Sequence, residues 1–418
     1  MTIAGPGGEA VRDLVRRHQS SGRALLYAFA GVDDVEVSAA GAWVTGASGR
    51  RYLDCGSVAV FLLGHGHPRV VEAVADQLHR MTGTSRAFPS AVNAEAARSL
   101  AAVAPPGLDK VMFLNSGTEA VEAALKLARA VTGRTPVLHL EWSFHGKTLG
   151  ALSLTDSDLL RGPVGPVAPG TERMSRSDPE AAAAAVRRVA PAAVFVEPVQ
   201  GEAGALEVSD GMLRALRVAC DEVGALLVAD EIQSGLGRCG DWWAHTRSGV
   251  RPDVLLTGKA LGGGVVPVSA VVARPEVFGP FDRDPLLHAS TFGGNPLACA
   301  AVVAALGVIG SEGIPDRAQR LGLRLRGVLE GVVEAWPDLF TGVSGRGLLL
   351  GLTCRRPDVA GDLYRACLQQ GLLVTPCLLR PDVIRFTPPA VLEEEELAFA
   401  EAALRAAAEV TAHEQAAG

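Results

Sequence analysis

The chain has 418 residues, of which 48% are apolar and 5% aromatic, and its formal net charge at pH 7 is −7. This length favours two or three domains, and this apolar content favours a packed α/β protein over a disordered one. Because lysine and arginine form no dense tract and no stretch approaches 18 uninterrupted apolar residues, we expect neither a nucleic-acid partner nor a membrane span, and small-molecule chemistry is favoured.

The N-terminal residues and the cysteines bear on the compartment. The first nine residues lack a positively charged stretch followed by an apolar one, which is the pattern of a secretory leader. The seven cysteines are scattered without a CxxC pair, as free thiols in a reducing compartment are. The sequence therefore predicts a cytoplasmic location.

Short apolar runs alternate with helical segments through the middle of the chain. Residues 30–50 are rich in turns, and a helix of roughly ten residues is predicted from Pro68. The strands predicted after it are 111–114, 137–140, 193–196, 225–229 and 254–257, and the helices between them are 118–131, 178–188 and 210–222. This alternation predicts a parallel sheet covered by helices, whose ligands bind beyond the carboxyl ends of the strands.

The last third of the chain has a different pattern. A long alanine-rich helix is predicted after residue 296, followed by a smaller α+β unit with strands 348–352 and 383–386 and a closing helix 391–412. No flexible linker separates the parts, so we expect them to pack together. The predicted division is 1–60 for an N-terminal part of the small domain, 61–304 for a large domain and 305–418 for the C-terminal small domain.

A turn after the strand 111–114 opens a helix with features of a phosphate site. Ser116 and Glu119 have the spacing of a capping box, and Gly117 allows a ligand to approach the backbone. Free N–H groups at the positive end of a helix suit a phosphate. An ordinary capped helix would carry the same residues, so the turn by itself leaves both interpretations open.

Lysine is scarce in this chain, which contains only Lys110, Lys126, Lys147 and Lys259. Lys259 follows a short apolar strand and precedes glycines that would let a bulky ligand approach. A lysine amine can form a Schiff base with a carbonyl, which a guanidinium cannot. Asp230 closes the preceding strand, so it is expected in the same cleft, where a carboxylate can pair with a protonated pyridine nitrogen. A strand-end aspartate is often only a cap, but the combination of amine, carboxylate and phosphate turn favours pyridoxal 5′-phosphate.

These features resemble the class III pyridoxal-phosphate aminotransferases, a family that includes ornithine, acetylornithine and 4-aminobutyrate aminotransferases. The resemblance extends from about Tyr52 to Arg385 and includes, in the family's order, Gly64-His65-Gly66-His67-Pro68, Asn115-Ser116-Gly117-Thr118-Glu119, Phe144-His145-Gly146, Glu197-Pro198-Val199-Gln200-Gly201-Glu202, Asp230-Glu231-Ile232-Gln233 and Ser290-Thr291-Phe292-Gly293-Gly294-Asn295-Pro296. It implies an α/β protein of fold type I, with a large domain around a mostly parallel sheet and a smaller α+β domain built from both chain ends.

The resemblance also implies a set of cofactor-contacting residues. They are Ser116, Gly117, Thr118, Phe144, His145, Asp230, Gln233, Lys259 and, from the neighbouring subunit, Thr291. In this assignment Lys259 is the catalytic residue, bonds to the cofactor and moves a proton, while Asp230 pairs with the pyridine nitrogen. Gln233 lies near the phenolic oxygen, and Phe144 stacks on the ring. A site completed across an interface implies a homodimer, and no metal is expected.

Three residues suggest the substrates. Arg385 resembles the family arginine that binds the α-carboxylate of glutamate or 2-oxoglutarate, for which a bidentate guanidinium is suited. Glu202 resembles the glutamate that covers this arginine when the other substrate presents an ω-amine. Lys147 stands where ornithine-type members have an arginine, which changes how a donor carboxylate is recognised. Four apolar residues suggest a more hydrophobic, altered donor pocket, namely Val58, Val60, Phe61 and Val266.

The resemblance predicts transfer of an ω- or primary amino group from an amine or amino acid to 2-oxoglutarate by a ping-pong route. The same cofactor residues would also serve an amino-acid racemase, an aminomutase or a decarboxylating enzyme, so these alternatives stay open. The pair of Glu202 and Arg385 favours transfer, because the alternatives need no 2-oxoglutarate. The amino donor is not specified by the sequence.

Overall fold

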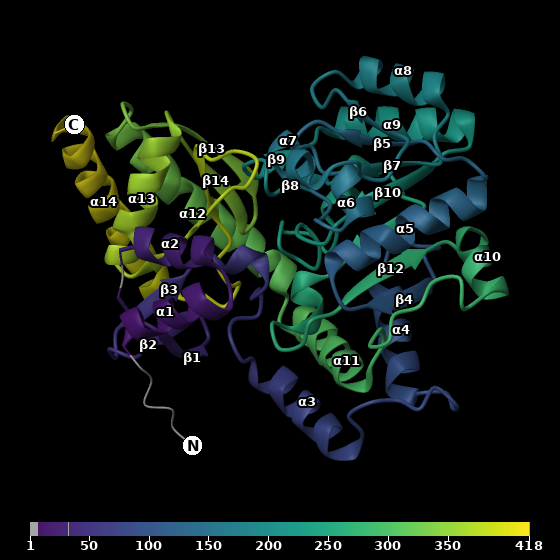
Figure 1. Cartoon of the computed structure of the whole chain (residues 1–418), viewed down its shortest axis with the longest axis horizontal. Helices are drawn as coiled ribbons and strands as arrows, with labels where there is room; N and C mark the ends of the chain where they lie inside the picture. The colour runs from purple at the N-terminus through teal and green to yellow at the C-terminus, as the bar shows by residue number, and fades with distance from the viewer. Residues whose placement is uncertain (1–6, 32, 418) are drawn as a thin grey trace.

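The computed structural model describes residues 7–31 and 33–417. Figure 1 shows two groups of elements: the N-terminal segments in purple and the C-terminal segments in yellow lie together on the left, and the middle of the chain forms the larger group on the right. The first six residues, on which the expectation of no leader partly depends, lie outside the described residues.

The larger group is built on a seven-stranded sheet. Its strand order is β4 (Lys110–Leu114), β12 (Ser269–Ala273), β11 (Val254–Thr257), β10 (Leu226–Asp230), β7 (Ala193–Val196), β5 (Val137–Leu140) and β6 (Thr171–Met174). Only β12 is antiparallel to its neighbours, and the other pairings in the sheet are parallel. The sheet is therefore mostly parallel, as predicted, although neither β12 nor β6 was among the predicted strands.

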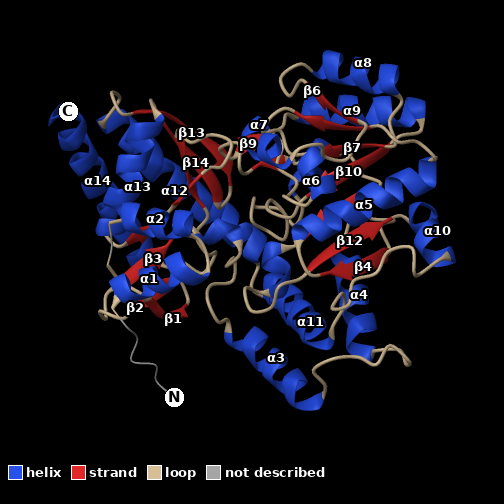
Figure 2. Cartoon of the chain, viewed as in Figure 1, coloured by secondary structure: helices blue, strands red, loops and turns tan. Residues whose placement is uncertain are grey.

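Helices surround this sheet, as Figure 2 shows. They are α3 (Pro68–Arg80), α4 (Ala91–Val103), α5 (Gly117–Thr132), α6 (Leu149–Ser153), α7 (Asp158–Arg161), α8 (Pro179–Val189), α9 (Asp210–Val223), α10 (Pro275–Arg283) and α11 (Pro296–Ser311), and short 3-10 turns occupy Ser57–Ala59, Gly162–Val164, Ala244–Ser248 and Lys259–Gly262. One hydrophobic cluster joins α3, α4 and α11 to the sheet, a second involves α5 and α10, and a third involves α8 and α9. Burial of apolar side chains on both faces explains why the strands are continuous apolar runs.

The smaller group contains both ends of the chain. One of its sheets has the strand order β1 (Glu36–Ala40), β2 (Trp43–Gly46), β3 (Arg51–Asp54) and β15 (Leu372–Leu373). The other has the order β13 (Phe340–Arg346), β14 (Leu349–Cys354), β17 (Val383–Phe386) and β16 (Thr375–Pro376). Its helices are α1 (Gly8–His18), α2 (Ser21–Phe29), α12 (Ile314–Ala335), α13 (Pro357–Gln369) and α14 (Glu394–Ala417). A separate two-stranded ribbon, β8 (Val199–Gln200) with β9 (Leu206–Glu207), is formed by the middle of the chain.

Early and late segments of the chain share one core in this smaller group. Leu53 pairs in parallel with Leu372, and one hydrophobic cluster contains both together with Leu352 and Leu404. We propose that this group is the small domain and that the group around the seven-stranded sheet is the large domain. The predicted boundary at residue 304 falls inside α11.

The cysteines and the helices add two observations. All seven cysteines are buried free thiols. Within residues 7–31 and 33–417, no single helix is long and apolar enough to cross a membrane, although α11 and α12, which meet at 64°, would pass that test of length and composition as a pair.

Candidate functional site

A cavity of about 350 Å³ lies beyond the carboxyl ends of β10 and β11. These strands are parallel neighbours with Asp230 in register with Leu256, so the residues that follow β11 lie beside Asp230. The cavity is lined by Gly117, Thr118, Phe144, His145, Gly146, Lys147, Glu197, Glu202, Asp230, Ile232, Gln233 and Lys259. The topology thus brings most of the predicted site residues together, as expected for an open parallel sheet.

Lys259 lies two residues beyond β11 and presents its amine to the cavity. Its backbone has a φ of +46°, a left-handed conformation that non-glycine residues rarely adopt and that is frequent at functional sites. Burial, together with the positive charge of Arg385, lowers the pKa of Lys259 to about 8 against the opposing effect of Glu202. A larger fraction of this amine is therefore neutral at physiological pH, which is the form that attacks a carbonyl.

Asp230 is held in place by a buried histidine. Its Oδ2 lies 2.7 Å from Nδ1 of His145, and its Oδ1 accepts a hydrogen bond of 3.1 Å from the backbone N–H of Ile232. Burial alone would lower the pKa of His145, but the hydrogen bond to Asp230 and its negative charge raise it. The carboxylate is thus oriented at the base of the cavity by a fully buried imidazole.

Glu197 lines the same cavity, although sequence reasoning gave it no role. Its Oε1 accepts a hydrogen bond of 2.8 Å from the backbone N–H of Phe144. Burial raises the pKa of Glu197 to about 8, although the positive charges of His145 and Lys259 act in the opposite direction. At neutral pH this carboxyl group therefore carries a proton. The sequence signals for it were its position just after the apolar strand 193–196 and its place at the start of the Glu197–Glu202 motif.

The N-terminus of α5 opens onto the cavity. The Ser116 hydroxyl accepts a hydrogen bond from the backbone N–H of Glu119, and the Glu119 carboxylate accepts one of 2.7 Å from the N–H of Asn115. The cap is therefore close to the predicted capping box. In the usual pattern Glu119 would accept the N–H of the N-cap residue Ser116, but here it accepts that of Asn115. The first N–H groups of a helix have no acceptor within it, so those of Gly117 and Thr118 are available to an anion.

Gly146 brings the turn after β5 against this helix end. Its φ is +133°, and a Cβ atom added there would lie 2.4 Å from Oγ1 of Thr118. Only glycine fits this approach. The two turns together enclose the end of the cavity where α5 begins.

Glu202, which lines the cavity, forms an ion pair with Arg385, which is fully buried and is not among the residues that line it. Glu202 Oε1 lies 2.6 Å from Nη1 of Arg385, which also donates a hydrogen bond of 3.4 Å to Oε1 of Gln233. Burial opposes the ionisation of Glu202, but the charges of Arg385 and Lys259 keep its pKa below the usual value. Within the described residues, Nε and Nη2 of Arg385 and Nε2 of Gln233 are buried without a hydrogen-bond acceptor. These groups are donors available to an anionic ligand.

Lys147 and Thr291 occupy different positions from the residues above. Lys147 is exposed at the edge of the cavity, with its Nζ 5.9 Å from the centroid of the Phe144 ring. Thr291 does not line the cavity of its own chain and is exposed; its carbonyl and that of Ser290 accept hydrogen bonds from the Arg86 guanidinium. The four apolar residues that the sequence suggested for the donor pocket do not line the cavity either: Val58, Val60, Phe61 and Val266.

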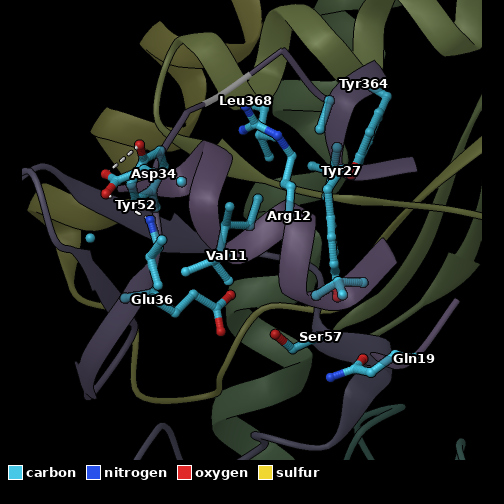
Figure 3. A pocket seen from close by; sticks show the side chains of 18 residues that line it. Val11, Arg12, Gln19, Tyr27, Asp34, Glu36, Tyr52, Ser57, Tyr364 and Leu368 are labelled. Carbon is cyan, nitrogen blue, oxygen red and sulfur yellow. Dashed lines mark hydrogen bonds between the residues drawn. The ribbon is translucent and has the colours of Figure 1, made fainter. Parts of the chain in front are cut away.

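A larger cavity of about 500 Å³ lies elsewhere, between the N-terminal helices and the small sheet. Figure 3 shows Asp34 and Tyr52 at one side of it and Tyr27 and Tyr364 at another. Burial opposes the ionisation of Asp34, but hydrogen bonds from Ser48 and Tyr52 lower its pKa to about 2. The residues that line this larger cavity include no lysine, whereas the smaller cavity brings together a lysine amine, the Asp230 carboxylate and the N-terminus of α5. The smaller cavity is therefore the candidate active site.

Comparisons with known proteins show the family of this chain. A sequence model of the family described as aminotransferase class-III matches residues 32–407. The chain is similar to an acetylornithine aminotransferase of Methanopyrus kandleri, with 46% identity over 85% of this chain and 90% of that protein. It is also similar to a putrescine aminotransferase of Pectobacterium atrosepticum, with 38% identity over 84% of this chain and 77% of that protein.

Solved structures show the same similarity at the level of the fold. The ornithine aminotransferase of Toxoplasma gondii superposes with a TM-score of 0.86 and 34% identity, covering 98% of this chain and 99% of that one. The acetylornithine aminotransferase of Elizabethkingia anophelis superposes with a TM-score of 0.81 and 32% identity, covering 96% and 99%.

Proposed function

Because the chain belongs to the class III aminotransferases, which use pyridoxal 5′-phosphate, we propose that it moves an ω- or primary amino group from an amine or amino-acid donor to 2-oxoglutarate by a ping-pong route. The observation that carries this proposal is the buried ion pair of Glu202 and Arg385 beside Lys259. A carboxylate that can cover or uncover a guanidinium lets one site accept both a donor that has no carboxylate beside its reacting amine and an acceptor that has one beside its carbonyl group.

The residues of the cavity fit the cofactor. The free N–H groups of Gly117 and Thr118, with the Ser116 cap, suit its phosphate, and Asp230, oriented by His145, suits its ring nitrogen. The unpaired amide nitrogen of Gln233 is a donor for its phenolic oxygen. When bound, the cofactor accepts the electrons released at the amino-bearing carbon of the substrate.

The protein's own groups then have separate tasks. The Lys259 amine, with its lowered pKa, holds the cofactor and afterwards takes and returns the proton at the amino-bearing carbon. Asp230, held by His145, would pair with the ring nitrogen of the cofactor, and Phe144 and Ile232 supply apolar surface in the cavity. Arg385 binds the α-carboxylate of 2-oxoglutarate once Glu202 has moved away. Lys147, at the cavity edge, contacts the donor.

The relatives named above act on acetylornithine, putrescine and ornithine, and this supports a donor with a terminal amine. We also propose a cytoplasmic homodimer. Its support is the exposure of Thr291, which leaves that hydroxyl free to reach the phosphate site of a partner subunit.

The test follows the two half-reactions by the absorbance of the cofactor. The holoenzyme is first converted to its aminated form, freed of donor and mixed with 2-oxoglutarate, which should restore the original spectrum and release glutamate. In Arg385→Ala this second half-reaction should need at least about tenfold more 2-oxoglutarate, because a charged bidentate contact is lost. Restoration by pyruvate and not by 2-oxoglutarate in the unmodified enzyme would show that the acceptor is wrong. Racemised or rearranged donor without a carbonyl product would indicate one of the alternative reactions.

A further inference from the structure

The hairpin that carries Arg385 also contacts Glu202 through its turn. Residues 377–382, here called the hairpin turn, connect β16 to β17. The backbone N–H of Leu378 donates a hydrogen bond of 3.2 Å to Oε2 of Glu202, and that of Leu379 donates one of 3.0 Å to its carbonyl oxygen. Because Arg385 contacts the other carboxylate oxygen, each oxygen of Glu202 has its own donor from the same hairpin.

Contacts within and around the hairpin turn fix the position of the Leu378 N–H. Arg380 Nε donates a hydrogen bond of 2.8 Å to Asp382, and the N–H of Val383 donates one of 2.9 Å to the carbonyl oxygen of Arg380. The Asp382 carbonyl oxygen in turn accepts a hydrogen bond of 2.8 Å from the N–H of Cys354 in β14. The turn that carries the donor is thus tied by backbone hydrogen bonds to the sheet that carries Arg385.

We propose that the hairpin turn latches Glu202 over Arg385 through the Leu378 N–H and thereby sets how readily Arg385 becomes free for a dicarboxylate. This inference rests on the proposed function, since it assumes that Glu202 moves away for the acceptor. The Leu378 bond exists only while Glu202 lies over Arg385. Its removal therefore weakens the covered state alone and shifts the population toward the uncovered one.

The direct test removes the N–H with Leu378→Pro and keeps it with Leu378→Ala as the matched control. Glutarate is the probe, because it carries two carboxylates but has no carbonyl or amine that could react, and its dissociation constant for the holoenzyme is measured by calorimetry. Leu378→Pro should bind glutarate about tenfold more tightly, as expected for one lost hydrogen bond to a charged group, while Leu378→Ala should change the affinity by less than about twofold. A merely structural defect would weaken binding instead.

A second variant keeps the test decisive if Leu378→Pro does not fold. Arg380→Ala opens the pair with Asp382, leaves the Leu378 N–H in place but less fixed, and should tighten glutarate binding by about threefold. The latch is overturned if a folded Leu378→Pro, or Arg380→Ala in its absence, binds glutarate no more tightly than the unmodified enzyme. It is equally overturned if Leu378→Ala tightens binding as much as Leu378→Pro. Failure of the proposed function has a different sign. In that case 2-oxoglutarate does not restore the original cofactor spectrum of the wild-type enzyme after its conversion to the aminated form.

Discussion

Two glutamates of one motif, Glu197 and Glu202, receive opposite properties from their surroundings. Burial raises the pKa of Glu197 to about 8, because its main partner is a backbone N–H and the positive groups nearby are too weak to compensate. Glu202 is also buried, but Arg385 lies 2.6 Å away and keeps its pKa below the usual value. The first carboxyl group is therefore neutral and the second ionised at neutral pH, as different tasks in one cavity require.

The lowered pKa of Lys259 predicts the pH dependence of cofactor capture. Below pH 8 the amine is mostly protonated and cannot attack, so the capture rate should rise about tenfold per pH unit toward pH 8 and level off above it. The apoenzyme is mixed with pyridoxal 5′-phosphate between about pH 6.5 and pH 9.5 and the absorbance of bound cofactor is followed. Lys259→Ala should show no such absorbance. A rate that is still rising tenfold per pH unit at about pH 9.5 would mean that the amine has an ordinary lysine pKa.

At the scale of elements, α5 organises the phosphate end of the cavity through one side chain. The Glu122 carboxylate of α5 accepts hydrogen bonds of 2.6 Å from the Thr148 hydroxyl, 2.9 Å from the N–H of Gly150 and 3.2 Å from that of Ala151. The Thr148 hydroxyl also lies 2.8 Å from that of Thr118. Glu122 thus attaches the start of α6, and with it the Gly146 turn, to the helix end that suits a phosphate.

This attachment predicts the effect of Glu122→Ala. Loss of three accepted hydrogen bonds, each contributing about 0.5–1.5 kcal/mol, should weaken cofactor binding by at least about tenfold, because the Gly146 turn is no longer held. The rate at saturating cofactor should fall much less. Equilibrium titration with pyridoxal 5′-phosphate measures the first quantity and steady-state kinetics the second. Glu122→Gln, which keeps one acceptor oxygen, should lie between Glu122→Ala and the unmodified enzyme; equal cofactor affinity in all three would contradict this role.

At the scale of the whole molecule, one buried arginine connects segments that are distant in the chain. The Arg238 guanidinium donates hydrogen bonds to the carbonyl oxygens of Leu348, Pro388 and Ala59. Burial lowers the pKa of Arg238 to about 10. One of its partners, Ala59, precedes it by 179 residues, and the other two, Leu348 and Pro388, follow it by 110 and 150 residues. The large domain is thus tied to both chain ends by a side chain that the proposed reaction does not use.

The proposed sharing of sites between subunits predicts complementation. Thr291→Asp should weaken cofactor binding through repulsion of its phosphate, and Lys259→Ala should be inactive. In a mixed dimer of the two variants, one site has Lys259 from one subunit and Thr291 from the other, so a random mixture should recover about a quarter of the unmodified activity. Each variant is unfolded and refolded alone as the control. Absence of recovery in a mixture shown to contain mixed dimers would place Thr291 outside the partner's site.

The local part of the fold could be predicted from the sequence. The strands at 137–140, 193–196, 254–257 and 383–386 have the predicted bounds, since short apolar runs between helical patterns are a local signal. Asp230 and Lys259 could be placed in one cleft for the same reason, because the carboxyl ends of neighbouring parallel strands meet at one sheet edge. The strand β12 was not among the predicted strands, and its antiparallel direction could not have been predicted either, because an apolar run does not indicate direction.

What the sequence by itself determined is therefore the family and its cofactor, through ordered motifs, and the placing of Lys259 and Asp230 at neighbouring strand ends in one cavity. Only the tertiary structure decided that Glu197 is neutral, that Thr291 does not line its own cavity and that Leu378 contacts Glu202 from 176 residues away. The physical reason is that charge state and hydrogen bonding depend on burial and on partners distant in the chain, and neither is encoded in the residues next to the group concerned.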